Sequence, residues 1–272
     1  MGQFDGQVVY ITGIARGQGR NHALRFAAEG ASIVGLDIAG PVTSHATYPS
    51  ATADDLAETV RLVEAAGGKI LARQGDIRDL DAQCSLVADA VEQFGKIDHV
   101  IANAGVLGWG AVWELSEEQF TDVIEVNLIG TWKTLRASIP ELLKGDTEGR
   151  SIVIISSVAG LKAMPDQAAY TASKFGLRGL AQSTAKELAP HRIRVNSVHP
   201  YAVDTPMGVA DSHALKLFSE KEHYLRHFIS MMDHYPVASL DDISDAVLYL
   251  ASRHARAVTG AEFQVDMGHS KV

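Results

Sequence analysis

The sequence has little of what a secreted, membrane-embedded or nucleic-acid-binding protein requires. A single cysteine, Cys84, among 272 residues excludes an intrachain disulfide and is typical of proteins kept in a reducing cytoplasm. No apolar run approaches the roughly 20 residues that cross a bilayer. Met1–Asp5 lacks the basic and apolar segments of a signal peptide. The net charge of −9 disfavours a nucleic-acid partner, which needs clustered Lys and Arg. We therefore expect a cytoplasmic protein with no nucleic-acid or membrane partner.

Short apolar runs alternate with longer stretches of helical periodicity. This alternation predicts one α/β domain over residues 1–272, with a doubly wound parallel sheet flanked by crossover helices. Thr52 and Asp55 form a capping-box pattern at the start of one helix. The expected strands are Val8–Ile11, Ile33–Leu36, Ile70–Ala72, His99–Ala102, Ile152–Ile155, Ile193–Val198 and Phe263–Val265. The other expected helices cover about 18–29, 80–94, 117–143, 168–187 and 241–251.

A glycine-rich turn, Thr12–Gly19, lies directly between the first strand and the first helix. Glycines in such a turn let a diphosphate approach backbone N–H groups at the positive end of the helix. Asp37 ends the second strand, where a carboxylate can hold both ribose hydroxyls and repel a 2′-phosphate. Arg16 favours NADP instead, since a guanidinium could pair with that phosphate. Because Asp37 is fixed on a strand and Arg16 lies on a loop, the predicted cofactor is NAD.

Tyr170 and Lys174 lie four residues apart in a helical stretch and therefore share one face. An adjacent ammonium would lower the tyrosine pKa from its usual ~10 and make it a usable base near neutral pH. Such a pair also arises by chance in many helices. Its position after the glycine turn, and after a strand that ends at Ser156 and Ser157, favours catalysis. Ser157 could orient the substrate oxygen toward Tyr170.

Four segments together resemble the short-chain dehydrogenase/reductase superfamily, and the resemblance extends from Val8 to Asp266. They are the Thr12–Gly19 turn, Asn103-Ala104-Gly105, Asn127 within Val126–Gly130, and Ser157 with Tyr170–Lys174. The resemblance implies a Rossmann-type fold and an NAD-dependent enzyme that interconverts an alcohol and a carbonyl by hydride transfer.

The resemblance also implies roles for individual residues. Asp76 and Ile77 would contact the adenine, Asn127 would support a water leading to Lys174, and Pro200 to Thr205 would cover the nicotinamide. Tyr201 departs from the glycine that most relatives have there. The implied catalytic residues are Asn127, Ser157, Tyr170 and Lys174. The implied cofactor-binding residues are Gly13, Arg16, Gly17, Gln18, Gly19, Asp37, Asp76, Ile77, Asn103, Ala104, Gly105, Tyr170, Lys174, Pro200, Val203 and Thr205.

A polar insertion, residues 39–50, is longer than the usual connection and could be an ordinary surface loop. With Ala51–Leu56 and Val203–Met207, however, it resembles the carveol-dehydrogenase-like, mycofactocin-associated subgroup. That resemblance implies that the insertion clasps NAD so that NAD does not exchange. Electrons would then pass to an external redox carrier.

Residues 204–236 are rich in large apolar side chains and are interpreted as a lid over the substrate. The rival interpretation is a helical pair packed into a subunit interface. With Trp109, Leu161, Met164 and Tyr201 nearby, the lid would enclose an apolar pocket for a hydrophobic secondary alcohol or its ketone.

Two other functions, one enzymatic and one non-enzymatic, are compatible with this fold. An exchangeable NAD(P)H-linked ketoreductase of the 3-oxoacyl type stays open, whereas the complete catalytic set disfavours a nucleotide-sensing protein on the same fold. His223 and His227 lack further ligands at suitable spacing, so no metal site is expected. By analogy with relatives, the helices near 117–143 and 168–187 would form contacts of a homotetramer.

Overall fold

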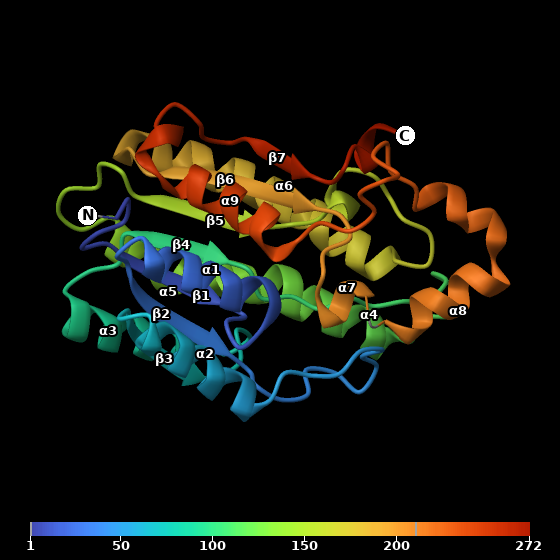
Figure 1. Cartoon of the computed structure of the whole chain (residues 1–272), viewed down its shortest axis with the longest axis horizontal. Helices are drawn as coiled ribbons and strands as arrows, with labels where there is room; N and C mark the ends of the chain where they lie inside the picture. The colour runs from blue at the N-terminus through green and yellow to red at the C-terminus, as the bar shows by residue number, and fades with distance from the viewer. Residues whose placement is uncertain (1, 210) are drawn as a thin grey trace.

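The computed structural model describes residues 2–209 and 211–272 of the chain. Seven parallel strands form one sheet in the order β3-β2-β1-β4-β5-β6-β7, which confirms the predicted Rossmann-type doubly wound fold (Figure 1). The strands are β1 (Val8–Thr12), β2 (Ser32–Asp37), β3 (Lys69–Gln74), β4 (His99–Ala102), β5 (Ser151–Ile155), β6 (Arg194–Pro200) and β7 (Glu262–Val265). β1, β4, β5 and β6 are buried along their whole length, as their continuous apolar character requires.

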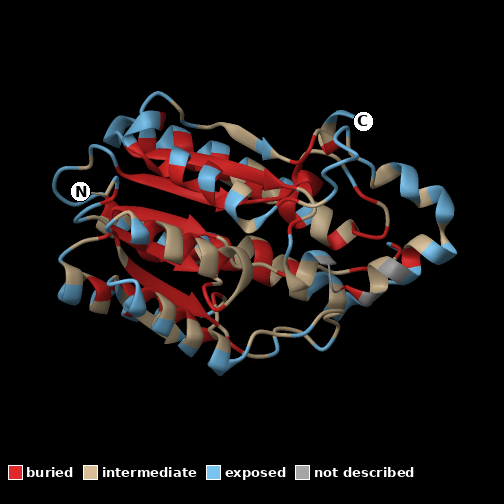
Figure 2. Cartoon of the chain, viewed as in Figure 1, coloured by how far each residue is buried: buried red, intermediate tan, exposed pale blue. Residues whose placement is uncertain are grey.

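Helices cover both faces of the sheet and enclose two hydrophobic cores (Figures 1 and 2). α1, α2 and α9 supply side chains to one core, and α3 to α6 supply the other. In the described part of the chain, no helix is long and apolar enough to cross a membrane. The helices are α1 (Gly17–Ala28), α2 (Ala53–Ala65), α3 (Leu80–Phe94), α4 (Glu117–Ile124), α5 (Thr131–Leu142), α6 (Ala168–Leu188), α7 (Pro206–Val209), α8 (Ser212–Glu220) and α9 (Leu240–Ala251).

The single helix predicted over 117–143 is interrupted, which corrects that expectation. A π-helical segment, η1 (Glu125–Gly130), separates α4 from α5. π-helical turns occur inside α-helices most often at functional sites. Asn127 lies within this segment and is fully buried. The irregularity therefore coincides with one of the predicted catalytic residues.

The carboxyl ends of the parallel strands meet at one edge of the sheet, where ligands bind in this architecture. The glycine turn follows β1, Asp37 ends β2, Asn103 follows β4, and Ser157 follows β5. The insertion and the lid segment with α7 and α8 extend beyond the same edge (Figure 1). The predicted site residues are thus gathered by the topology of the sheet.

Candidate active site

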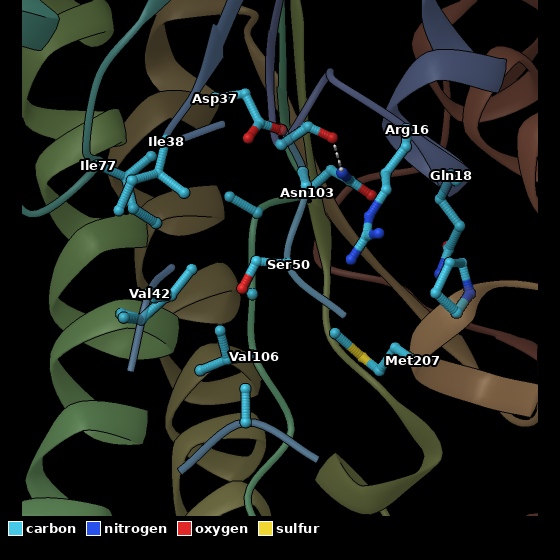
Figure 3. A pocket seen from close by; sticks show the side chains of 18 of the residues that line it. Arg16, Gln18, Asp37, Ile38, Val42, Ser50, Ile77, Asn103, Val106 and Met207 are labelled. Atoms are coloured by element: carbon cyan, nitrogen blue, oxygen red, sulfur yellow. Dashed lines mark hydrogen bonds between the residues drawn. The ribbon is translucent and has the colours of Figure 1, made fainter. Parts of the chain in front are cut away.

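A cleft of about 180 Å³ lies beside the glycine turn and is called the cofactor cleft here. Asp37 stands at one end of the cleft and Val106 at the other (Figure 3). Ile38, Ile77 and Val42 lie on one side, facing Arg16, Gln18 and Met207 (Figure 3). The predicted cofactor residues that line it are Gly13, Arg16, Gly17, Gln18, Asp37, Asp76, Ile77, Asn103, Ala104, Gly105 and Thr205.

The glycine turn has the geometry that a dinucleotide diphosphate requires. A Cβ at Gly19 would lie 1.9 Å from the carbonyl oxygen of Gly13, and Gly13 itself has φ +72°. Side chains are therefore excluded where the diphosphate would approach the backbone. Arg16 at the N-cap of α1 makes no side-chain capping bond, and the first turn contains no acidic residue. The free backbone N–H groups of the first turn of α1, together with the helix dipole, favour an anion at the N-terminus of this helix. The residues present therefore fit a dinucleotide.

Asp37 is held in place by two backbone donors. Its Oδ2 accepts a hydrogen bond from the Ala15 N–H at 2.9 Å, and its Oδ1 accepts one from the Ala39 N–H at 2.8 Å. The side chain is buried at the end of the cleft. Each carboxylate oxygen keeps a second lone pair, so the group can also accept hydrogen bonds from a ribose diol.

Asp76 and Ile77, the predicted adenine contacts, also line the cofactor cleft. Arg78 Nε and Nη2 donate to Asp76 Oδ2 at 2.9 and 2.7 Å, and Nε also donates to Oδ1 at 3.1 Å. Burial opposes ionisation of Asp76, but the Arg78 hydrogen bonds outweigh it and hold the pKa of this carboxyl below its usual value. Ile77 is buried, and its side chain packs against Gly130, where a Cβ would approach within 2.7 Å.

A second cavity of about 220 Å³, called the substrate cavity here, adjoins the cofactor cleft. Gln18, Thr205 and Met207 line both spaces. Ser157 and Tyr170 face the substrate cavity, as do the predicted cofactor residues Pro200 and Val203. Its wall is mostly apolar and includes Leu107, Trp109, Met164, Tyr201, Phe218 and Phe228. Leu161, which was expected here, is not among the lining residues.

Burial governs the two titrating groups of the predicted catalytic pair. It raises the pKa of Tyr170, while a hydrogen bond with Ser157 acts in the opposite direction. Burial also lowers the pKa of Lys174 to about 7. The lysine Nζ lies 5.5 Å from the Tyr170 ring centroid and donates to the Ile155 carbonyl oxygen at 3.0 Å. Burial and the Ser157 hydrogen bond are thus the causes of the shift in the Tyr170 pKa, and the Lys174 ammonium is directed at a backbone carbonyl.

Asn127 links three segments behind the cavities. Its Oδ1 accepts from the Val106 N–H at 2.8 Å, and its Nδ2 donates to the Val106 carbonyl at 2.9 Å and to Ser173 Oγ at 3.0 Å. A Cβ at Gly105 would lie 3.1 Å from Asn127 Oδ1 and 3.5 Å from Lys174 Nζ. Asn127, Gly105 and Lys174 are therefore neighbours, although only Gly105 reaches the cofactor cleft.

The lid segment covers the substrate cavity with only part of its apolar surface. Phe218 and Phe228 line the cavity, whereas Ile229 and Met231 are 53% and 64% exposed. The side chain of Leu215 lies outside the described residues. Tyr201 contacts the lid segment directly. Its hydroxyl donates to the Phe228 carbonyl at 2.5 Å, and its ring stacks on the His269 ring with the two centroids 3.8 Å apart. Tyr201 is therefore part of the cavity floor and a support for the lid.

The insertion lies against the cofactor cleft. Five of its residues, Gly40, Val42, Ala46, Tyr48 and Ser50, line the cleft. Arg16 donates to the Pro49 carbonyl, and the Leu107 N–H donates to Tyr48 Oη at 3.2 Å. The sequence predicts an insertion beside the adenosine end of the cofactor but does not single out Tyr48, because its contact with Leu107 depends on a loop that is distant in sequence.

Comparison with known proteins agrees with this geometry. A family model described as enoyl-(acyl carrier protein) reductase matches residues 13–270. An uncharacterized NAD-dependent oxidoreductase of Mycobacterium tuberculosis is 50% identical over 271 residues, which cover 99% of this chain and 98% of that protein. The (−)-trans-carveol dehydrogenase of Rhodococcus erythropolis is 39% identical, with coverage of 98% and 99%. A crystal structure of a short-chain dehydrogenase from Mycobacterium paratuberculosis bound to NAD is 44% identical, superposes with a TM-score of 0.96 and covers both chains completely.

Proposed function

Since the chain belongs to the short-chain dehydrogenase/reductase family, we propose that it is an NAD-dependent dehydrogenase that oxidises a hydrophobic secondary alcohol to its ketone. The main observation that supports this proposal is that Ser157 and Tyr170 line a mostly apolar cavity next to the cofactor cleft. A relative that is 39% identical over nearly the whole chain is named for such an alcohol. The apolar wall favours a substrate without charged groups.

The reaction needs a hydride acceptor and a proton acceptor at the same carbinol. The nicotinamide of bound NAD supplies the hydride acceptor. Tyr170 in its phenolate form accepts the hydroxyl proton, and Ser157 donates a hydrogen bond to the oxygen as it becomes a carbonyl. The hydrogen bond between Ser157 and Tyr170 supports this assignment, because two hydroxyls that share a hydrogen bond are close enough to contact one substrate oxygen.

Lys174 and Asn127 support this proton transfer from behind the cavity. Lys174 can hold or release a proton near neutral pH, because burial lowers its pKa to about 7. Asn127 fixes the backbone of Val106 and orients Ser173, whose hydroxyl donates to the Tyr170 carbonyl at 2.7 Å. The two residues thereby position the helix turn that carries Tyr170.

We further propose that the insertion retains NAD between turnovers and that an external redox carrier reoxidises it in place. This proposal is supported by the bonds that hold the insertion over the cleft: Arg16 to Pro49, Leu107 to Tyr48, and Arg78 Nη2 to the Val42 carbonyl at 3.4 Å. Gln74 Nε2 adds a bond to the Ala39 carbonyl, at the start of the insertion, at 3.3 Å. Release of the dinucleotide would require several of these bonds to break together.

The test is oxidation of carveol by the purified protein, first with free NAD alone and then with an artificial redox dye. We expect turnover with the dye and little with NAD alone. Turnover with free NAD alone would indicate an exchangeable cofactor and favour the ordinary ketoreductase alternative. No turnover of any hydrophobic secondary alcohol under either condition would contradict the proposed reaction.

A further inference from the structure

A buried carboxylate stands in the wall of the substrate cavity. Asp211 lies at the N-terminus of α8, is 3% exposed, and lines the same cavity as Ser157 and Tyr170. Its Oδ2 accepts a hydrogen bond from Trp109 Nε1 at 2.6 Å. Its Oδ1 accepts one from the His213 N–H at 2.9 Å and caps the helix. The carboxylate is therefore fixed in position by two neutral donors.

The charge of Asp211 has no cationic partner among the described residues. No Lys, Arg or His nitrogen in the described ranges lies within 4.0 Å of its carboxylate oxygens. A second buried carboxylate of the same region, Asp166, provides the contrast, because Lys221 Nζ lies 2.6 Å from its Oδ2. Asp166 is thus neutralised at the edge of the lid, whereas Asp211 presents a net negative charge to the cavity.

The surroundings make that charge effective toward a bound molecule. Most of the neighbouring wall is apolar, with Leu107, Met164 and Phe218 among its side chains. Charges interact more strongly in such a weakly polarisable, water-poor space than in bulk water. Asp211 and Tyr170 both raise the pKa of Tyr48, in addition to the larger effect of burial. Asp211, Ser157 and Tyr170 thus line one cavity.

We propose that Asp211 is a specificity-determining residue that excludes anionic alcohols from the active site. Resting on the proposed function, this inference narrows the substrate class to neutral or cationic secondary alcohols. Alcohols that carry a carboxylate or a phosphate would meet an uncompensated like charge in a buried space, which disfavours their binding when no counter-charge is supplied. An acidic substituent would thus be rejected even where its shape fits.

A matched pair of alcohols isolates the charge from the shape. The probes are trans-4-hydroxycyclohexanecarboxylate and its carboxamide, with turnover measured through the redox dye at pH 8. We expect kcat/KM to be at least about tenfold higher for the carboxamide. In Asp211→Asn this ratio should fall severalfold, because kcat/KM for the carboxylate rises.

Asparagine is a suitable replacement because it also caps helices and can still accept one of the two hydrogen bonds. The matched control is Asp233→Asn, which removes an equal charge from a side chain that is 95% exposed on the same segment. This control should leave the ratio unchanged. If Asp211 acted only as a helix cap and a lid contact, Asp211→Asn would change kcat/KM for both substrates by the same factor.

Binding of the corresponding ketones, 4-oxocyclohexanecarboxylate and 4-oxocyclohexanecarboxamide, is measured by calorimetry. This experiment tests the charge effect without turnover. The carboxamide should bind more tightly to the native protein, and Asp211→Asn should remove that preference. Equal binding of the two ketones, or a preference that survives Asp211→Asn, would overturn the inference. Failure of both alcohols to turn over while the binding preference persists would contradict the proposed reaction instead.

Discussion

Tyr170 and Lys174 are both buried, and burial shifts their two pKa values in opposite directions. The tyrosine pKa rises and the lysine pKa falls to about 7, so both groups favour their neutral forms. Ser157 opposes this effect at Tyr170 through its hydrogen bond. At the scale of single residues, Ser157 is therefore the group that most directly favours the phenolate in this arrangement.

Tyr170→Phe tests the role of the phenol. The substitution removes the only atom that can accept the alcohol proton at this position while keeping the ring that lines the cavity. We expect dye-coupled turnover to fall by a factor of about 10² or more, the usual contribution of a positioned acid or base. Binding of NAD, followed by its retention through gel filtration, should change little. Residual turnover within a factor of three of the native rate would contradict the assignment.

At the scale of elements, the insertion is joined to the cleft by bonds of unequal strength. The Arg16 bond to Pro49 is charge-assisted, and the bond between Leu107 and Tyr48 connects the insertion to a wall of the substrate cavity. The contact between His45 and Glu118, at 3.5 Å, joins partly or fully exposed side chains. The first two bonds should therefore govern NAD release more than the third does.

Release of bound NAD should accelerate in Arg16→Ala and in Tyr48→Phe. A hydrogen bond to a charged group contributes about 1.5–3 kcal/mol and a neutral one about 0.5–1.5 kcal/mol. We therefore expect an increase of about tenfold or more for Arg16→Ala and a smaller one for Tyr48→Phe, measured by the exchange of bound NAD against a labelled excess. His45→Gln is the matched control and should leave the rate nearly unchanged. Equal release from all three variants and the native protein would refute the clasp.

The elements differ in how far the sequence could predict them. Strands such as β5 were predicted from continuous apolar runs, because a strand buried on both faces needs no alternation. The capping box of Thr52 and Asp55 is a local pattern and forms as predicted. The π-helical η1 could not be predicted, because it accompanies the contacts of Asn127 with Val106 and Ser173, which are distant in sequence.

For the lid and the candidate site too, the sequence could not predict contacts between residues that are distant along the chain. The apolar composition of residues 204–236 predicted a lid but did not show which side chains would turn inward. Phe228, which lines the cavity, and Met231, which is exposed, could therefore not be distinguished from the sequence. The predicted nucleotide residues gather at one sheet edge because the topology of parallel strands requires it. Asp211 was missed, because an Asp before a helix reads as an ordinary cap and only the fold brings it to Trp109.

At the scale of the whole molecule, acid sensitivity follows from buried histidines in the core. His99 Nε2 donates to Gln7 Oε1 and its Nδ1 accepts from Ser151 Oγ, both at 2.8 Å. Burial lowers the pKa of His99 to about 4 and that of His22 to about 3. An unfolded histidine titrates near ~6.5, so between about pH 6.5 and 4 only the unfolded chain binds these protons. Stability is therefore complete above that window and falls as the pH decreases through it.

The free energy of unfolding should thus be lower at pH 5 than at pH 7.5, by about 2 kcal/mol for each of these histidines. Urea denaturation at the two pH values measures the difference. His99→Gln removes one titrating group and should reduce the pH difference by about 2 kcal/mol, whatever its effect on stability at pH 7.5. An unchanged pH difference in this variant would show that His99 is not responsible.

Exposed aromatic side chains bear on the predicted homotetramer. Phe120, Trp132 and Phe175, on α4, α5 and α6, are between 39% and 45% exposed. These helices include those expected to form subunit contacts, and burial of such side chains would favour association. Light scattering during size-exclusion chromatography should give the mass of four chains. Replacing Trp132 with Glu should shift the protein to a smaller species, and a native monomer would contradict the prediction.

The most direct measurement of the central claim is a single turnover by the purified protein after free nucleotide has been removed. Carveol is added without NAD or dye, and absorbance at 340 nm is followed. The account predicts a rise that corresponds to one reduced nicotinamide for each bound NAD, and no such rise in Tyr170→Phe. No absorbance change until free NAD is supplied would contradict the claim that this chain oxidises the alcohol with NAD that it retains.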